Sequence, residues 1–583
     1  MIKLKKKQYL WLSWLSCLSL SVLPLTICPV LSAERIYVSY SLFERSIPVK
    51  DLEIYAQEGR LTPNLAAYTR YLNKQQLANL RVGLQAQINL DPVTISQFLY
   101  TPIGERLLQR VGQVVQTDAR QSGFYAIRAA LILAAASPRG LTALSVLRNF
   151  PSQGIRVDLA KGLGILQSVQ EFIAQTNAAV VAVQNQSQPA DNTHPELNAF
   201  QVKALQFPGP LAWEKITLQL NDQTPRRLEL TGAPRAFLAD IYLPKLVSVR
   251  PSPVIVISHG LGSDRMSFAY LAQHLASYGF VVAVPEHPGS SSQQLQALLS
   301  GGSNDVTKPT EFVDRPLDIK FLLDELNRRS QSDLVFQGRL NLEQVGAIGQ
   351  SFGGYTVLAL AGAQINFEQL QKDCGTNLDR TLNASLLLQC RALALPARNY
   401  DLTDPRVKAA IAVNPIDSSV FGQPGLRQIK IPVMLVSGSA DTVAPALPEQ
   451  IQPFTWLTTP EKYLVVLDGG THFSTIAESN PESKVIPVPP ALIGPATGLA
   501  RNYLNALSLA FFRTYTANQS SYTRYLTPAS IKLISQEPLN LSLNQTLSAA
   551  QLVQALRGKP ANLPPTTAPE AQPFPGASIN RQK

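Results

Sequence analysis

Hydrophobic positions recur with two different periods along the chain, and the change lies near residue 210. Before it, the apolar positions have helical spacing. Proline costs nothing in the first turn of a helix, where its missing N–H would have no partner. Thr62-Pro63, Asp91-Pro92 and Ser137-Pro138 therefore each predict a helix start. We expect an all-helical accessory domain over residues 34–183, with no chemistry of its own.

Beyond residue 210 the apolar positions gather into short runs. Val254–Ser258 is continuously apolar, as expected of a parallel strand that is covered on both faces. Helix-compatible segments such as Met266–Tyr278 and Arg315–Arg328 separate the runs, and this alternation predicts an α/β fold with a doubly wound, mostly parallel sheet. The expected strands are Lys215–Leu220, Arg227–Leu230, Phe237–Leu243, Val254–Ser258, Phe280–Val284, Gln344–Ile348, Val407–Val413, Pro432–Val436 and Tyr463–Leu467.

Composition predicts the remaining boundaries. Residues 184–210 are polar and contain prolines, which is typical of a linker. The α/β domain is expected over residues 211–520, with residues 364–400 as a lid insertion because they interrupt the strand–helix alternation. Residues 521–583 form a C-terminal extension. From about residue 556 it is rich in proline and poor in large apolar groups, so we expect disorder there.

The first 33 residues have the order of a secretory signal peptide. A lysine cluster precedes the apolar stretch Tyr9–Leu25, and Leu31-Ser32-Ala33 supplies the small residues of a cleavage site. We therefore expect export, to the periplasm or the medium. The alternative is a membrane anchor formed by an uncleaved N-terminal segment.

Two cysteines, Cys374 and Cys390, lie beyond this segment. A pair of cysteines in an exported chain favours a disulfide, here inside the predicted lid. Two unpaired thiols are the alternative.

The charge of the chain excludes few functions. The formal net charge is +11 over 583 residues, which is compatible with an ordinary basic protein or with contact to an anionic membrane surface. We find no zinc-type spacing of cysteine and histidine, no Walker loop and no RNA-binding aromatic signature. We expect no nucleic-acid partner, no metal and no cofactor, and the sequence does not indicate an oligomeric state.

The strongest chemical signal is the pentapeptide Gly349-Gln350-Ser351-Phe352-Gly353, which lies between a predicted strand and a predicted helix. This order places a nucleophilic serine on the sharp turn at the top of an α/β-hydrolase sheet. A serine hydroxyl needs a base to accept its proton. Because the chain order in this fold is serine, acid, histidine, His472 is the one histidine of five that fits.

The acid is expected between Ser351 and His472, near the end of a strand. Asp441 fits best, in the turn Gly438-Ser439-Ala440-Asp441 that follows a predicted strand. Asp417 and Asp468 are the alternatives. Its role would be to fix the imidazole tautomer and to stabilise the imidazolium.

Acyl transfer also requires donors for the developing oxyanion. One is expected to be the backbone N–H of Phe352, directly after the nucleophile. The other is expected to be the N–H of Leu261, in the glycine-rich turn His259-Gly260-Leu261-Gly262. His259 is then a residue that shapes the loop.

With these motifs, residues 235–475 resemble the α/β-hydrolases of the dienelactone hydrolase and platelet-activating-factor acetylhydrolase branch. His259-Gly260-Leu261-Gly262, Pro285-Glu286-His287-Pro288-Gly289 and Ser351-Phe352-Gly353-Gly354 carry the resemblance. It supports Leu261 and Phe352 as oxyanion donors. In the acetylhydrolases the acid follows the strand that here ends near Val413. This chain has Asn414 at the matching position, whereas the later turn with Asp441 is similar to that of other α/β-hydrolases.

The helical N-terminal region resembles, more loosely, a domain of unknown function that precedes such hydrolases in cyanobacterial proteins. That likeness implies no chemistry.

The sequence therefore predicts a serine carboxylester hydrolase that acts on a small-molecule or lipid ester through an acyl-enzyme. A serine peptidase is one alternative, because the same triad cleaves amides. A non-catalytic binding protein with the α/β-hydrolase fold is the other.

Overall fold

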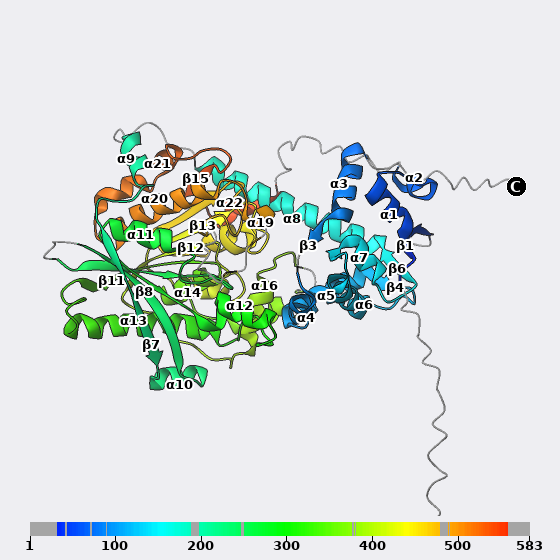
Figure 1. Ribbon diagram of the computed structural model, residues 1–583. Helices are drawn as coiled ribbons and strands as arrows, with labels where there is room; N and C mark the ends of the chain where they lie inside the picture. The colour runs from blue at the N-terminus through cyan, green and yellow to red at the C-terminus, as the bar shows by residue number, and fades with distance from the viewer. Residues whose placement is uncertain are drawn as a thin grey trace, which may run out of the picture. The chain divides into compact units, whose positions relative to one another are not determined.

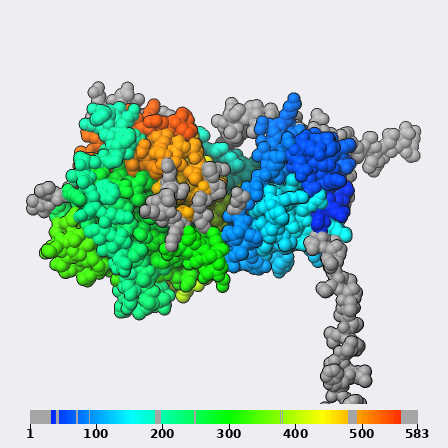
Figure 2. All heavy atoms as spheres, in the orientation of Figure 1, coloured from blue at the N-terminus to red at the C-terminus, as the bar shows by residue number. Residues whose placement is uncertain are grey.

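The computed structural model describes most of the chain, and the described residues are coloured in Figure 2. The predicted signal peptide lies outside the described residues up to residue 31, as do residues 188–196 of the predicted linker and residues 558–583 of the extension. The described residues are 32–40, 43–69, 73–88, 90–187, 197–245, 250–375, 378, 381–477, 485, 488 and 490–557.

The chain folds as two compact units that do not follow one another along the sequence. Among the described residues, the smaller unit comprises those within 32–88 and 115–158, and the larger comprises those within 90–114 and 159–557. The domain boundaries predicted from composition, including the one at residue 183, stay predictions.

The smaller unit contains a sheet as well as helices. Its four strands lie in the order β2-β1-β6-β4, which the helical periodicity did not predict. The run of β-branched and aromatic residues in Ile36, Tyr37 and Val38 is the local signal that could have indicated it. The strands are β1 (Arg35–Tyr40), β2 (Phe43–Pro48), β4 (Val115–Thr117) and β6 (Gly154–Asp158), with a separate pair of β3 (Gln87–Ile88) and β5 (Leu141–Thr142). The helices are α1 (Val49–Glu58), α2 (Pro63–Thr69), α3 (Lys74–Gln85), α6 (Phe124–Ala136) and α7 (Ala143–Arg148).

A nine-stranded sheet has the strand order β15-β14-β13-β12-β11-β9-β10-β8-β7. It forms the centre of the larger unit, with helices around it (Figure 1). Its middle strands, from β14 to β10, are parallel, and β15, β8 and β7 add antiparallel edges. The α/β prediction is therefore confirmed. The strands are β7 (Trp213–Asp222), β8 (Arg235–Pro244), β9 (Ser252–Ser258), β10 (Val281–Pro285), β11 (Leu340–Gln350), β12 (Val407–Val413), β13 (Val433–Gly438), β14 (Lys462–Leu467) and β15 (Leu541–Asn544).

Helices cover both faces of this sheet. In β9, Val254 and Val256 join one hydrophobic cluster, whereas Ile255 and Ile257 join the other. Because alternate residues of a strand point to opposite faces, both faces are buried. The longer helices of this unit are α4 (Pro92–Leu99), α5 (Pro102–Val114), α8 (Leu159–Gln186), α11 (Ala269–Ser277), α12 (Ser292–Leu299), α13 (Glu311–Ser332), α14 (Phe352–Leu360), α15 (Phe367–Cys374), α20 (Thr497–Tyr515) and α22 (Ala549–Arg557). The shorter ones are α9 (Ala199–Ala204), α10 (Pro225–Thr231), α16 (Leu386–Gln389), α17 (Gly422–Leu426), α18 (Gln452–Phe454), α19 (Pro490–Ile493) and α21 (Pro528–Lys532).

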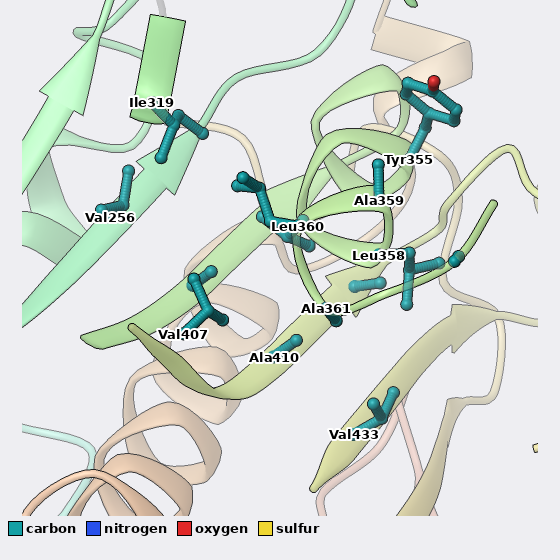
Figure 3. Close-up of a cluster of buried hydrophobic side chains, with 14 of the residues drawn as sticks. Val256, Ile319, Tyr355, Leu358, Ala359, Leu360, Ala361, Val407, Ala410 and Val433 are labelled. Atoms are coloured by element: carbon teal, nitrogen blue, oxygen red, sulfur yellow. The ribbon is translucent and has the colours of Figure 1, made fainter. Parts of the chain in front are cut away.

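The helix that follows the predicted nucleophile is buried on all sides. Every residue of α14 is buried, and its Leu358 and Leu360 share one hydrophobic cluster with Val407 and Val433 of the sheet (Figure 3). This packing holds the start of α14 rigidly against the strands.

The helices α4 and α5 belong to the larger unit although residues of the smaller unit flank them in sequence. α4 packs on α12. A Cβ placed on Gly262 would lie 2.9 Å from Leu295 Cδ2 of α12, so α12 in turn lies against the predicted oxyanion loop.

The segment Arg227–Leu230, predicted as a strand, belongs instead to helix α10. Thr224 caps this helix, Pro225 occupies its first turn and Gly232 ends it in the left-handed region. Thr224-Pro225 is the same helix-start signal as Thr62-Pro63, so the sequence itself indicated a helix at this position. The strand prediction was wrong because it overlooked that signal.

No helix among the described residues is long and apolar enough to cross a membrane.

The contribution of buried charge to the stability of the larger unit can be measured at Arg227. Its fully buried guanidinium binds Asp222, Asp314 and Asp318 at 2.7–2.8 Å. Arg227→Ala leaves these carboxylates partly uncompensated and should lower the free energy of unfolding by about 3–5 kcal/mol. The neighbouring Arg226 is half-exposed, and Arg226→Ala should cost less than about 1 kcal/mol. Urea unfolding of both variants measures the difference, and equal losses would contradict the prediction.

Candidate active site

Three predicted residues lie at the carboxyl edge of the parallel strands. Ser351 follows β11, Asp441 lies in the turn after β13, and His472 lies in the loop after β14. Neighbouring parallel strands end at the same edge of a sheet, so the topology brings the three loops together.

Ser351 occupies a strained turn between β11 and α14. Its backbone has φ 57° and ψ −117°, in a region that side-chain-bearing residues rarely adopt. Glycine is required on both sides. A Cβ on Gly349 would lie 2.2 Å from the Gly353 carbonyl oxygen, and one on Gly353 would lie 2.0 Å from the Ser258 carbonyl oxygen. The Ser351 N–H donates to the Val413 carbonyl at 2.9 Å and ties the turn to β12.

His472 and Asp441 are directly hydrogen-bonded. The distance from His472 Nδ1 to Asp441 Oδ2 is 2.7 Å, and both side chains are buried. The other carboxylate oxygen accepts the N–H groups of Val443 and Ala444 at 2.7 and 2.8 Å, which fixes its orientation. Because a carboxylate only accepts, Nδ1 carries the proton and Nε2 is left to accept one.

Two side chains outside the predicted set brace these loops. Gln350 donates through Nε2 to the His472 carbonyl at 3.0 Å. Asn414 accepts the Gly438 N–H at 2.9 Å and donates to the Thr471 carbonyl at 3.1 Å. Asn414 therefore joins the loop of Asp441 to the loop of His472, which spacing along the chain could not reveal.

The two alternative acids have other surroundings. Asp468 accepts a hydrogen bond from Ser439 at 3.0 Å. Asp417 is fully buried, and among the described residues no group donates to its carboxyl oxygens. Burial, and to a smaller extent the nearby Glu449, raises the pKa of Asp417 well above its usual range. A carboxyl that forms no hydrogen bond with an imidazole cannot orient it.

Two backbone donors lie unused beside Ser351. A Cβ on Gly260 would be 3.4 Å from Ser351 Cβ, so the loop after β9 runs alongside the serine. Phe352 opens helix α14, and its N–H has no intrahelical acceptor. Within the described part of the chain, no hydrogen bond uses the N–H of Leu261 or Phe352. These two groups can receive an oxyanion.

His259 shapes this loop from inside. Its Nε2 accepts the His287 N–H at 3.0 Å, so its proton is on Nδ1, which bonds the Gly260 carbonyl at 2.8 Å. Burial and the nearby Arg315 hold the pKa of His259 well below its usual range. Both nitrogens are occupied, which leaves none for proton transfer.

A second Ser–His–Asp arrangement lies beneath the loop. Ser258 Oγ is 3.0 Å from His287 Nε2, and His287 Nδ1 is 2.9 Å from Asp318 Oδ2. All three residues are fully buried, and Ser258 Oγ also accepts from Arg315 at 3.2 Å. Burial and the positive charge of Arg315 keep the pKa of His287 well below its usual range, so this imidazole is a poor base. Ser351 and His472, by contrast, are 6% and 4% exposed.

Cys374 and Cys390 form a disulfide with a Cα–Cα distance of 5.5 Å. It links α15 to the turn after α16, within the segment predicted as a lid. No cluster of potential metal ligands occurs among the described residues.

Comparisons with known families agree with the sequence motifs. The family described as "Alpha/beta hydrolase of unknown function (DUF1400)" matches residues 32–158, and "Platelet-activating factor acetylhydrolase, isoform II" matches residues 245–302. The second range includes β9, the predicted oxyanion loop and α12. Both predicted resemblances are confirmed.

Curated relatives are similar over part of their length. The chain is 21% identical to Cutinase 2 of Thermobifida cellulosilytica over 282 residues, 47% of this chain and 72% of the relative. It is 21% identical to Cutinase cut1 of Thermobifida fusca, of which it spans 59%. It is 29% identical to the platelet-activating factor acetylhydrolase of Cavia porcellus over 155 residues, 22% of this chain and 34% of the relative.

The close approach at Gly353 can be tested through stability. Gly353→Ala forces a methyl group into the Ser258 carbonyl and should lower the free energy of unfolding by about 1–3 kcal/mol or more. Gly164→Ala in α8 is the matched control, because a Cβ there meets no atom within 4 Å; it should raise stability by up to about 1 kcal/mol. Urea denaturation compares them. A Gly353→Ala protein as stable as the parent would contradict this geometry.

Proposed function

We propose that this chain, an α/β-hydrolase of the platelet-activating-factor acetylhydrolase branch, hydrolyses carboxylic esters through Ser351. The relatives named as cutinases and acetylhydrolases support ester hydrolysis. One observation supports the proposal further: Ser351, the hydrogen-bonded Asp441–His472 pair and the backbone N–H groups of Leu261 and Phe352 all belong to segments that follow parallel strands of one sheet.

In the proposed mechanism Ser351 Oγ attacks the ester carbonyl while His472 Nε2 accepts its proton. The N–H groups of Leu261 and Phe352 stabilise the tetrahedral oxyanion. Asp441 keeps the Nδ1 proton in place and stabilises the imidazolium. The imidazolium then protonates the leaving alcohol, and the acyl group stays on Ser351. Water then attacks the acyl-enzyme while His472 Nε2 accepts its proton; the bond from the acyl group to Ser351 Oγ breaks, Oγ takes the proton back from His472, and the acid is released.

The substrate class follows from the relatives. We propose a small-molecule or lipid ester and no resident cofactor. The disulfide-linked segment around Cys374 and Cys390 is proposed as the lid that screens substrates.

Ser351→Ala removes the nucleophile, and hydrolysis of p-nitrophenyl butyrate should fall by about 10⁴-fold or more. Ser330→Ala, at a partly exposed position of α13 far along the chain from the predicted site loops, is the control and should keep full activity. A fluorophosphonate probe should label the parent protein, with the adduct mapped to Ser351 by peptide mass spectrometry. An adduct on Ser258, or full activity in Ser351→Ala, would refute the assignment.

Two asparagine substitutions test which aspartate orients His472. Asp441→Asn removes the acceptor of the Nδ1 proton and should lower kcat by about 10³–10⁴-fold. Asp417→Asn changes a buried carboxyl that forms no hydrogen bond with His472 and should change kcat by less than about 3-fold. Steady-state kinetics on the same ester measure both. The opposite ranking would transfer the role to Asp417.

A further inference from the structure

Arg315 of α13 is a fully buried arginine that joins elements on several sides. Its Nε donates to Thr356 Oγ1 at 3.0 Å and its Nη1 to Ser290 Oγ at 2.6 Å. Its Nη2 donates to Ser258 Oγ at 3.2 Å and to the His259 carbonyl oxygen. One planar group therefore contacts the end of β9, the turn after β10 and the nucleophile helix α14.

Two of these contacts lead to the elements that carry the unused N–H groups. The His259 carbonyl lies two residues before Leu261. Thr356 Oγ1 donates in turn to the Phe352 carbonyl at 2.8 Å, and the Arg315 guanidinium lies 4.7 Å from the centre of the Phe352 ring. A guanidinium is rigid and its donors have fixed directions, so it sets the distance between the two elements.

Glu311 and Asp318 act on Arg315 electrostatically, but their hydrogen-bonded connections to it run through other side chains. Ser290 Oγ donates to Glu311 Oε2 at 2.6 Å, and Ser258 connects Arg315 to Asp318 through His287. Among the described ion pairs none includes Arg315. Its positive charge is therefore not quenched by direct contact with a carboxylate, and it lies beneath the loop where an oxyanion would form.

We propose that Arg315 is the positioning residue of the oxyanion hole: it holds the Leu261 and Phe352 N–H groups at a fixed separation and adds positive potential beneath them. The buried Ser258–His287–Asp318 arrangement is the support that orients Arg315. This inference rests on the proposed ester hydrolysis and extends it to a residue that does not touch substrate.

The test compares an ester with its thiono analogue, in which sulfur replaces the carbonyl oxygen. Sulfur accepts hydrogen bonds weakly, so an oxyanion hole favours the oxygen ester. Arg315→Lys cannot bridge both elements, and its kcat for p-nitrophenyl butyrate should fall by about 10²-fold with KM within about 3-fold. The kcat for the thionoester should fall much less. The ratio of kcat for the oxygen ester to kcat for the thionoester should therefore fall at least about 10-fold.

Three further variants keep the test decisive. Thr356→Val removes the hydroxyl that links Arg315 to the Phe352 carbonyl and should lower the same ratio of kcat values. Thr356→Ser keeps the hydroxyl and should give the ratio of the parent protein. This pair decides the question even where Arg315→Lys does not fold. Arg513→Lys, a replacement on α20 where the arginine binds the Tyr278 carbonyl, is the control and should leave the ratio unchanged.

Rates are normalised to the fraction of protein that a fluorophosphonate probe labels. The inference is overturned if kcat falls equally for both substrates in Arg315→Lys and Thr356→Val, so that the ratio does not change. Arg315 would then have only a structural role. A parent protein that hydrolyses neither substrate would instead overturn the proposed function.

Discussion

Helix α14 and the loop after β9 approach each other so closely that no side chain fits between them. A Cβ on Gly353 would collide with the Ser258 carbonyl, and one on Gly260 would lie 2.4 Å from Gln350 Oε1. This contact places Ser351, the Phe352 N–H and the Leu261 loop side by side. The buried packing of α14 and the contacts of Arg315 with Thr356 and the His259 carbonyl maintain it.

Two histidines of the larger unit share one hydrogen-bond pattern but have different surroundings. In both, Nδ1 is bonded to an aspartate. His287 is surrounded by arginines and lies out of reach of water, so burial and positive charge disfavour its protonated form. His472 borders the loops at the edge of the sheet. The two pairs contain the same residue types and differ in their surroundings. For this reason we assign a structural role to His287–Asp318 and propose a catalytic role for His472–Asp441.

Local patterns identified what depends on local geometry. The strand–turn–helix order indicated the turn at Ser351, and chain order selected His472 among the histidines. Asn414 and Arg315 escaped prediction because their partners come from distant segments. The charged face of α13 resembles a solvent-exposed one, and its burial depends on how the helix meets α10 and the sheet. The short antiparallel strand β15 and the sheet of the smaller unit also gave no periodic signal strong enough to predict them.

The course of the chain between its two units has a consequence for how this protein can be divided. The chain passes from one unit to the other near residues 89, 114 and 158, and the inserted α4 packs on α12, which lies against Gly262. A deletion of residues 34–183 would strip α4, α5 and most of α8 from the larger unit. Each unit is therefore built from two separate segments of the chain, and neither can be removed as one continuous piece. To exchange either unit in a chimaeric protein, the junctions near residues 89, 114 and 158 must all be redesigned together.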